Sequence, residues 1–445
     1  MCGLAEVLLN LGHKISGSDI KASEITRRLA ELGAKVTLGH SGQNVSGADV
    51  VVVSSAVSDD NPEVLAARHD FIPVIPRAEM LAELMRLKYA VAVAGSHGKT
   101  TTTSLVGAML TKAGLDPTLV IGGRLNHLGA GARLGQGDLL VAEADESDGS
   151  FLFLSPTIAL VTNIDLEHMN YYRDMDHLKD NFLAFINKVP FYGFSVLCLD
   201  DVNVQSLIPK VKKRYLTYGF SGQAEISAQN IQCGAWGYGF DLYRSGRNLG
   251  RVGLNIPGRH NVLNSLAAAA VGLEMGLAPE LVIAGLAELQ GIGRRLEKKG
   301  EAGGVTVLDD YGHHPTEIRA TLAALTECFP GRRLVVVFQP HRPSRIQSLF
   351  NDFTLAFNQA DRLIITDIYG AGEVPIEGLD AQRLVEAVRS HGHREVAYQA
   401  DLSGLAKNLA ANLAPGDVLL TLGAGNINLV ADETLRAISL MSEHQ

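Results

Sequence analysis

The stretch YAVAVAGSHGKTTTT, residues 89–103, decides the fold of this chain. Residues 89–94 are apolar and predict a buried strand, and residues 95–100 form a loop that contains two glycines. A helix with one apolar face follows and ends at Gly114. A strand, a loop and a helix start in this order bring backbone N–H groups to one point, where the helix dipole adds positive potential. The stretch therefore predicts a phosphate-binding loop in an α/β sheet.

The residues of the loop suit a magnesium nucleotide. Glycines let the backbone approach the phosphates, Lys99 neutralises their outer charge, and Thr100 offers a hydroxyl to Mg²⁺. The loop is shorter than the common GxxxxGKS/T pattern, because Val93 stands at the place of the first glycine. A turn can carry these letters by chance, but the flanking strand and helix favour nucleotide binding. The candidate nucleotide-binding residues are Gly95, Ser96, His97, Gly98, Lys99, Thr100 and Thr101.

Two acidic segments follow strands of the same predicted sheet. Residues 139–142 are followed by EADESD (143–148), and residues 158–162 by IDLEH (164–168) after Asn163. Because ligands bind at the carboxyl ends of parallel strands, we expect both segments to face the loop. Carboxylate oxygens suit Mg²⁺, which keeps several waters, so only a few of these residues would bind it. The alternatives are a solvated acidic turn for the first segment and a structural histidine at the end of the second.

The chain alternates between strand-like apolar runs and helical stretches in three blocks, residues 1–88, 89–295 and 296–445. This alternation predicts α/β domains with parallel sheets and helices on both faces. The middle of the second block, residues 192–257, is richer in short strands, and an alanine-rich helix follows over residues 261–276. The strands predicted in the first and third blocks are residues 35–38, 49–53, 73–75, 305–308, 334–338, 363–366 and 418–422.

The first block begins unusually for a doubly wound domain. It starts with a helical pattern that ends at Gly12, and a short strand follows over residues 14–18. Domains of this class normally begin with a strand and a glycine-rich turn before that helix. We therefore expect the leading strand and glycine turn to be missing from this chain; a domain that starts with a helix is the alternative.

Composition limits the classes of function. A length of 445 residues favours two or three domains, and a net charge of −9 argues against nucleic acid as the main partner. No apolar run approaches the ~20 residues of a membrane span, and no signal sequence opens the chain. The four cysteines show no metal-binding spacing and are expected to be reduced thiols. We expect a cytoplasmic protein without membrane insertion, monomeric or homodimeric.

With these motifs, the sequence resembles the Mur ligase family. The resemblance rests first on residues 95–103, 143–151 and 162–172. They match the family's ATP loop, its EADES-type segment and its TNxxxEHM/DHM segment. It extends over nearly the whole chain. The further matching segments are GRHNVLN (258–264), GRR (293–295), DDYGHHP (309–315) and QPHR (339–342) with Arg345.

The resemblance implies three domains and assigns a role to each. Residues 1–88 would form a truncated Rossmann-like domain for a UDP-sugar, residues 89–295 a P-loop ATPase domain, and residues 296–445 a Rossmann-like domain for an amino acid. It also implies ATP and Mg²⁺ as cofactors, with Lys99 on the ATP phosphates.

The resemblance further implies a set of site residues. Mg²⁺ would be held by Thr100, Glu143 and His168. The nucleotide would also contact Asn261, Arg295 and Asp310. The acceptor side would be formed by Tyr311, His313, His341, Arg342 and Arg345. The uridine diphosphate would touch the segments Ser18-Asp19 and Ser54-Ser55-Ala56.

The combination SHGKTTTT, EADESD, DDYGHHP and QPHR implies the member activity that joins L-alanine to the lactyl carboxylate of UDP-N-acetylmuramate. That reaction belongs to peptidoglycan precursor synthesis and yields ADP and phosphate through an acyl-phosphate. Besides the missing leading strand and glycine turn, three features depart from the family pattern. Pro343 stands where a tyrosine is usual, Asn170 replaces an aspartate, and no lysine clearly matches the carbamylated lysine of some members.

The chemistry of the reaction predicts roles for individual residues. Phosphorylation turns a poor electrophile into an acyl-phosphate, and Lys99 with the metal stabilises the charge of the transferring phosphoryl group. The attacking amine must lose a proton, and His313 or His341 suits that task, although a structural role is equally open for either. Arg342 and Arg345 suit a clamp on the acceptor carboxylate, with a solvated helix face as the alternative.

Three rival functions remain open. One is a related ligase that re-attaches a recovered peptide to UDP-N-acetylmuramate or extends folate with glutamate. A second is a regulatory P-loop NTPase, which leaves the downstream histidine and arginine segments unexplained. A third is a nicotinamide-dependent oxidoreductase, suggested by Asp19 at a strand end and weakened by the missing GxGxxG.

Overall fold

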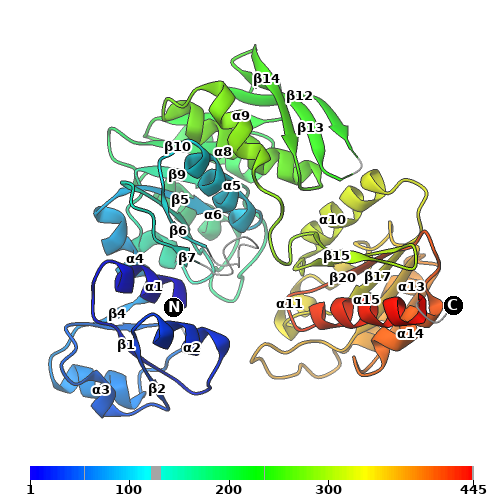
Figure 1. Ribbon diagram of the computed structural model, residues 1–445, viewed down its shortest axis with the longest axis horizontal. Coiled ribbons are helices and arrows are strands. Elements are labelled where there is room, and N and C mark those ends of the chain that lie inside the picture. Colours follow the sequence, from blue (N-terminus) through cyan, green and yellow to red (C-terminus); the bar gives the residue numbers. More distant parts are fainter. Residues whose placement is uncertain (55, 122–131, 235, 443–445) are drawn as a thin grey trace. The chain divides into compact units, whose positions relative to one another are not determined.

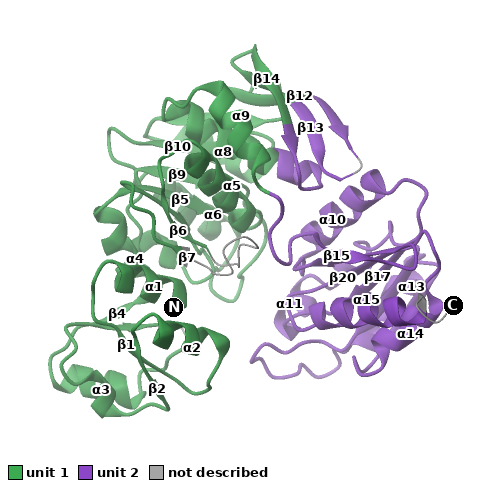
Figure 2. Ribbon diagram, in the orientation of Figure 1, with its two compact units in different colours: residues 1–229, 241–252, 263–289 green, residues 230–240, 253–262, 290–445 purple. Residues whose placement is uncertain are grey.

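The computed structural model describes residues 1–54, 56–121, 132–234 and 236–442. The chain divides into two compact units (Figure 2). Unit 1 consists of residues 1–229, 241–252 and 263–289. Unit 2 consists of residues 230–240, 253–262 and 290–445. Both units alternate strands with helices, so the predicted α/β class is confirmed (Figure 1).

The first part of unit 1 contains two parallel strand pairs, β1–β2 and β3–β4. The strands are β1 (Ser16–Asp19), β2 (Lys35–Leu38), β3 (Val51–Val53) and β4 (Val74–Pro76). The helices beside them are α1 (Cys2–Asn10), α2 (Glu24–Glu31), α3 (Pro62–His69) and α4 (Arg77–Arg86). The predicted strands are therefore present, with ends shifted by one or two residues except in β2.

A sheet of ten strands follows, in the order β14-β13-β12-β11-β10-β9-β5-β8-β6-β7. Its strands are β5 (Tyr89–Ala94), β6 (Thr118–Val120), β7 (Ala132–Arg133), β8 (Leu139–Glu143), β9 (Ile158–Val161), β10 (Phe194–Cys198), β11 (Tyr215–Gly219), β12 (Ile226–Cys233), β13 (Tyr238–Arg244) and β14 (Arg247–Leu254). Strand β5 pairs in parallel with both β8 and β9, and Val93 lies opposite Glu143 while Ala94 lies opposite Val161. This register places the acidic segment after β8 and the segment after β9 on either side of the loop at residues 95–98.

Helices enclose the middle of this sheet. They are α5 (Lys99–Lys112), α6 (Met175–Ile186), α7 (Val202–Leu207), α8 (Arg259–Glu274) and α9 (Pro279–Ala287). Alternate residues of β5, Ala90, Ala92 and Ala94, belong to one core with Phe182 and Phe185 of α6. The small alanine side chains leave room for these aromatic rings, so α6 packs closely against the sheet.

Unit 2 contains a sheet of six strands in the order β15-β16-β20-β17-β18-β19. Its strands are β15 (Glu297–Ala302), β16 (Val305–Asp310), β17 (Leu334–Phe338), β18 (Arg362–Thr366), β19 (Val396–Gln399) and β20 (Val418–Leu422). Strand β15 is antiparallel to β16, and the other pairings are parallel.

Helices cover both faces of this second sheet. They are α10 (Pro315–Cys328), α11 (Pro343–Ser348), α12 (Phe350–Thr354), α13 (Ala381–Ser390), α14 (Leu405–Asn412) and α15 (Asn428–Ser442). Leu334, Val336 and Phe338 of β17 join one core with α10 to α13, whereas Val335 and Val337 join another with α14 and α15. The alternation is that of a doubly wound sheet, as the sequence predicts.

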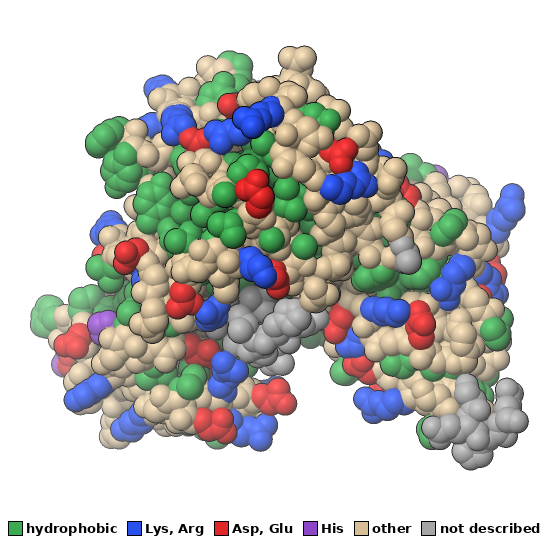
Figure 3. Space-filling view, turned by 45° about the horizontal axis from the view of Figure 1, so that its top comes forward, with side chains coloured by type: hydrophobic (Ala, Val, Ile, Leu, Met, Phe, Trp, Pro, Cys, Tyr) green, Lys and Arg blue, Asp and Glu red, His purple; other side chains and the backbone are tan. Residues whose placement is uncertain are grey.

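One face of the molecule carries charges of both signs. On the face drawn in Figure 3, basic and acidic side chains are interspersed among hydrophobic and other polar groups. Among the helices that the structure describes, none combines the length and the apolar character that a membrane crossing requires.

The contact between α5 and α9 depends on glycine. A Cβ at Gly285 of α9 would lie 2.6 Å from the Cα of Met109 in α5, and one at Gly272 of α8 would lie 2.6 Å from the Met109 Sδ. Real Cβ atoms do not approach backbone this closely, so the absence of a side chain at Gly285 sets how near the two helices lie.

We predict that Gly285→Ala destabilises unit 1 by about 1–3 kcal/mol, because α9 must move away from α5, although alanine is the better helix former. Urea unfolding followed by circular dichroism measures the change. Gly222→Ala, also in unit 1, is the matched control, since nothing lies within 4 Å of its added Cβ. Equal stability of the two variants would contradict this account of the helix contact.

Candidate functional site

The loop between β5 and α5 is held by the segment that follows β9. The backbone N–H of His97 donates to Asn163 Oδ1 at 2.9 Å, and the His97 carbonyl accepts from Asn163 Nδ2 at 3.0 Å. Thr162 Oγ1 donates to the same carbonyl at 2.6 Å. Gly95 has φ +129° and its added Cβ would lie 2.0 Å from Thr162 Oγ1, so only glycine fits there.

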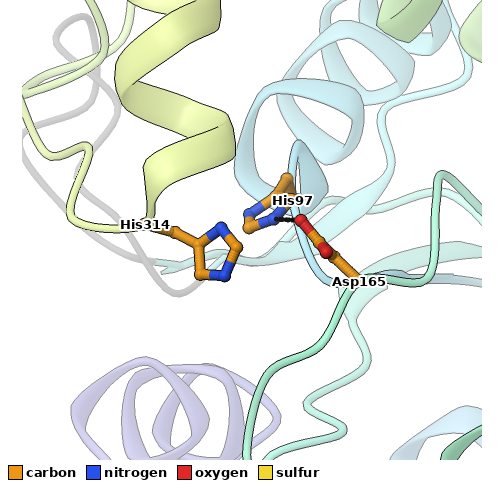
Figure 4. A group of neighbouring side chains, drawn as sticks. All are labelled: His97, Asp165 and His314. Atoms are coloured by element: carbon orange, nitrogen blue, oxygen red, sulfur yellow. Dashed lines mark hydrogen bonds and ion pairs between the residues drawn. The ribbon is translucent and has the colours of Figure 1, made fainter. Parts of the chain in front are cut away.

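The neighbouring residues of the loop contact Asp165. Ser96 Oγ accepts from the Asp165 backbone N–H at 2.8 Å, and His97 Nε2 lies 3.0 Å from Asp165 Oδ2. Figure 4 shows this histidine and carboxylate pointing at each other from the loop before α5 and the segment after β9. Asp165 thus fixes the loop, a role that the sequence did not single out.

The second glycine of the loop packs against a helix of unit 1. Gly98 has φ +83°, and its added Cβ would lie 2.6 Å from Oδ1 of Asn264 in α8. Both glycines that the sequence assigned to a phosphate loop are therefore required by their surroundings. The loop is formed in the structure as a hydrogen-bonded turn at the start of α5.

Lys99, the first residue of α5, points back over this turn. Its ammonium donates to the Gly95 carbonyl at 2.6 Å, to the Ser96 carbonyl at 3.2 Å and to Glu146 Oε1 at 2.8 Å. Burial alone would lower the pKa of Lys99, but the Glu146 carboxylate raises it above its usual value. The lysine is therefore protonated at neutral pH, and its ammonium lies against the loop.

Three ligand-type side chains gather beside Lys99. Ligand atoms of Glu146, Glu167 and His168 lie within 4.8 Å of one another, and His168 Nε2 is 3.7 Å from Glu146 Oε1. This donor set of two carboxylates and an imidazole suits a divalent cation. His168, which the sequence assigned to the metal, belongs to this group. Glu143 lies outside it, at the end of β8, and its role as a ligand stays a prediction.

Burial gives Glu146 unusual electrostatics. Its side chain is 1% exposed, and burial raises the pKa of the carboxyl to about 7, with Lys99 opposing that shift. Carboxylates with strongly raised pKa values cluster at functional sites. Neither Glu146 nor Glu167 was singled out within its acidic segment by the sequence analysis, because the choice among adjacent carboxylates depends on which one turns inward.

In unit 2, the carboxyl ends of three neighbouring strands bring together the predicted acceptor segments. Asp310 ends β16 opposite Leu422 of β20, and Phe338 of β17 lies on the other side of Leu422. Asp310 accepts from the backbone N–H groups of Leu296 and Gly312 at 2.7 and 2.8 Å. Burial raises the pKa of this carboxyl to about 6.

Two guanidinium groups flank the ring of Tyr311. The Arg294 and Arg295 guanidinium carbons lie 4.9 and 5.0 Å from the ring centroid, which is the range of cation–π contacts. Asn261, the third residue of α8, is buried and donates from Nδ2 to the Pro257 carbonyl at 2.6 Å. These contacts order the predicted nucleotide residues Arg295, Asp310 and Asn261 and the predicted substrate residue Tyr311 within unit 2.

The two candidate histidines differ in their hydrogen bonds. Arg345 Nη1 lies 3.2 Å from His341 Nδ1, so that nitrogen accepts and the ring proton is on Nε2. His313 Nδ1 faces the Tyr311 carbonyl at 3.0 Å, so that nitrogen donates and Nε2 carries the lone pair. Burial, helped by His313 and nearby arginines, lowers the pKa of His341 to about 3.

The acceptor segment is also shaped by Tyr369 and by strained backbone. The Tyr369 ring stacks on His341 with centroids 5.6 Å apart, and the Arg342 N–H donates to the Tyr369 carbonyl at 2.8 Å. Arg342 has φ +66°, which costs energy for a non-glycine residue and is typical of functional sites. Tyr369 was missed by the sequence analysis, since it lies 28 residues after His341 in the chain.

The predicted diphosphate residues lie at the ends of β1 and β3. Ser18 Oγ donates to Glu63 Oε2 at 2.7 Å, and Asp19 accepts from the Lys21 N–H at 3.1 Å. Ser54 follows β3, and Ser55 lies outside the described residues. Glu63 of α3 also accepts from Asn44 Nδ2 at 2.6 Å, so it links β1 to the segment between β2 and β3.

Comparison with known proteins agrees with this geometry. Three family models match the chain: "Mur ligase family, catalytic domain" at residues 1–89, "Mur ligase middle domain" at 93–272 and "Mur ligase, glutamate ligase domain" at 294–425. A UDP-N-acetylmuramate–L-alanine ligase of Geobacter sp. (strain M21) is 57% identical over 443 residues, which cover 100% of this chain and 96% of the relative.

Solved structures show the same fold. UDP-N-acetylmuramate-alanine ligase from Thermotoga maritima matches with a TM-score of 0.82 at 27% identity, covering 100% of this chain and 97% of that one. A MurF ligase from Thermotoga maritima in complex with ADP matches with a TM-score of 0.66 at 17% identity, covering 100% of both chains. The fold class predicted from the sequence, with its three α/β domains, is confirmed. The chain belongs to the Mur ligase family.

Proposed function

We propose that this chain is the ATP-dependent ligase that joins L-alanine to the lactyl carboxylate of UDP-N-acetylmuramate, with release of ADP and phosphate. The observation that carries the proposal is the hydrogen-bonded turn at residues 95–98, over which Lys99 is held by Glu146 and two backbone carbonyls. The high identity to UDP-N-acetylmuramate–L-alanine ligases over the full chain supports this choice among the family activities. The product is a precursor of peptidoglycan, so the enzyme serves cell-wall synthesis.

The loop performs the first step. Backbone N–H groups at the start of α5 and the Lys99 ammonium stabilise the charge that spreads over the outer oxygens of the transferring phosphoryl group. The group of Glu146, Glu167 and His168 fits a divalent cation. The proposed ligands of Mg²⁺ are Thr100, Glu143 and His168, with Glu146 and Glu167 nearby. When bound, the metal supplies further positive charge to the phosphates. Asn261, Arg295 and Asp310 complete the proposed nucleotide contacts.

The second step needs a neutral amine. Because its Nδ1 donates to a backbone carbonyl, His313 carries its lone pair on Nε2. It is therefore suited to accept the proton of the amine. His341 is a poorer base, since its pKa is lowered to about 3 and Arg345 occupies Nδ1. We assign His341 to positioning the acceptor side, together with Tyr311, and assign Arg342 and Arg345 to the acceptor carboxylate.

The remaining assignments complete the proposal. Residues 1–88 bind the UDP-sugar through Ser18, Asp19, Ser54 and Ser55, residues 89–295 bind ATP, and residues 296–445 bind the amino acid. The enzyme acts in the cytoplasm as a monomer or homodimer, on small-molecule substrates and without nucleic acid.

A substrate series tests the function. With ATP, Mg²⁺ and UDP-N-acetylmuramate, we expect L-alanine to drive phosphate release, and omission of either the sugar nucleotide or the amino acid to abolish it. Faster release with a recovered cell-wall peptide would favour the peptide-attaching ligase. Steady ATP hydrolysis without any carboxylate substrate would instead favour a regulatory NTPase.

We predict that Lys99→Met lowers the rate of phosphate release at least about 10³-fold, because the charge on the outer phosphates then loses its fixed cation. Lys112→Met is the matched control on the same helix, since this lysine pairs with Glu288 near the surface. Circular dichroism verifies that both variants fold. Near-normal turnover in Lys99→Met would remove the loop from the mechanism.

We predict that His313→Gln lowers kcat, and that the deficit shrinks as the pH rises through the pKa of the alanine amine. The amine then loses its proton without help from the enzyme, so a base is no longer needed. The measurement is the ratio of kcat for the wild type and the variant at several pH values. His341→Gln serves for comparison, and its deficit should not depend on pH. A pH-independent ratio for His313→Gln would exclude it as the base.

A further inference from the structure

Glu146 occupies an unusual place between the phosphate loop and the candidate metal ligands. It lies between β8 and the short 3₁₀ helix η2 (Ser150–Phe153), and its backbone carbonyl is fixed by the Tyr172 hydroxyl at 2.5 Å and the Gly149 N–H at 3.0 Å. Its Oε1 binds Lys99, whereas Oε2 is buried and has no hydrogen-bond partner among the described residues. A carboxylate with one unsatisfied oxygen in the interior is costly.

This cost is not needed for folding. An apolar side chain of similar volume would fill the same space without desolvating a charge, and such replacements of buried ion pairs are often neutral or stabilising. The position of Glu146 therefore points to a task at the site rather than to the stability of the domain.

That task concerns Lys99. An ammonium has three donor positions, and all three of those on Lys99 are directed at groups of the protein: the Gly95 carbonyl, the Ser96 carbonyl and Glu146. A phosphate can reach the ammonium only if at least one of these bonds is given up. Glu146 is the charged partner, and its negative charge also repels an incoming phosphate.

The metal-ligand group supplies a way to release the lysine. Glu146 Oε1 lies 3.7 Å from His168 Nε2, and Glu167 Oε2 lies 3.8 Å from the same nitrogen. A divalent cation in this group would neutralise the Glu146 carboxylate and weaken its hold on Lys99. The lysine would then be available to the nucleotide phosphates that the same cation accompanies.

We infer that Glu146 is a positioning residue that holds Lys99 against the loop until a nucleotide binds, and thereby makes nucleotide binding depend on a divalent cation. The inference rests on the proposed function, because it assumes that the loop binds a magnesium nucleotide. It differs from a plain metal-ligand role for Glu146, which would leave binding without metal unchanged. It also differs from a purely structural role, which would move binding with and without metal together.

The test is calorimetric titration with ADP, in Mg²⁺ and in EDTA, of the wild type and Glu146→Gln. In EDTA we expect the variant to bind ADP about tenfold more tightly than the wild type, the change that loss of one opposing charge interaction can produce. In Mg²⁺ the two proteins should bind within a few fold of each other. The Mg²⁺ dependence of affinity should therefore fall in the variant.

Two further proteins sharpen the test. Asp148→Asn, an exposed carboxylate of the same segment, should keep the wild-type dependence on Mg²⁺. Adding Glu146→Gln to Lys99→Met should change the EDTA affinity much less than adding it to the wild type, because the lysine that Glu146 restrains is then absent. Should Glu146→Gln melt at a lower temperature than the wild type, Glu146→Met provides a variant without unpaired polar atoms for the same titrations.

The possible outcomes distinguish between the roles of Glu146. Unchanged or weaker ADP binding by Glu146→Gln in EDTA would overturn the inference, and weaker binding only in Mg²⁺ would assign Glu146 as an ordinary metal ligand. A wild type that fails to bind ADP even with Mg²⁺ would instead refute the proposed function, which keeps the two failures distinct.

Discussion

The parallel pairing of β5 with β8 and β9 is the constraint on which the rest of the site depends. Because Val93 lies opposite Glu143 and Ala94 opposite Val161, the chain leaves all three strands at one edge of the sheet. The acidic segment, the phosphate loop and the segment from Thr162 to His168 are therefore neighbours. Asn163 and Thr162 then bond both the N–H and the carbonyl of His97 and hold the loop in its turn.

This arrangement concentrates opposite charges in a buried space. Glu146 stabilises Lys99 as a cation, and burial raises the pKa of Glu146 to about 7. A loop whose lysine is already paired with a carboxylate differs from a loop that presents an unpaired cation. The Lys99–Glu146 pair would couple nucleotide binding to metal binding. Such coupling accounts for the carboxylates that surround a phosphate-binding loop.

Much of the fold could be predicted from the sequence, where the pattern was strong. The apolar runs of β5, β17 and β20 have the predicted bounds, because long buried parallel strands consist of continuous apolar residues. Strand β15 was missed because its sequence EKKGEA is charged and its place is set by pairing with β16. The signal was the glycine pair before Val305: Gly303 and Gly304 both have positive φ and form the tight turn of that hairpin.

In the site, too, local sequence predicts some residues, whereas contacts between distant residues decide the others. Gly95, Gly98 and Lys99 could be recognised from local order alone, since their task follows from a strand, a turn and a helix. The pairing of Lys99 with Glu146, the hold of Asp165 on the loop and the stacking of Tyr369 on His341 join residues that are far apart in the chain. No periodicity encodes such contacts, and a choice among Glu143, Asp145 and Glu146 needs the direction in which each side chain turns.

The central claim is that residues 95 to 100 bind the outer phosphates of a magnesium nucleotide. A crystal structure with Mg²⁺ and a nonhydrolysable ATP analogue tests it most directly. We expect the β- and γ-phosphates within hydrogen-bond distance of the loop N–H groups, with the Lys99 ammonium moved from Glu146 to a phosphate oxygen. An empty loop with the nucleotide bound elsewhere would contradict it.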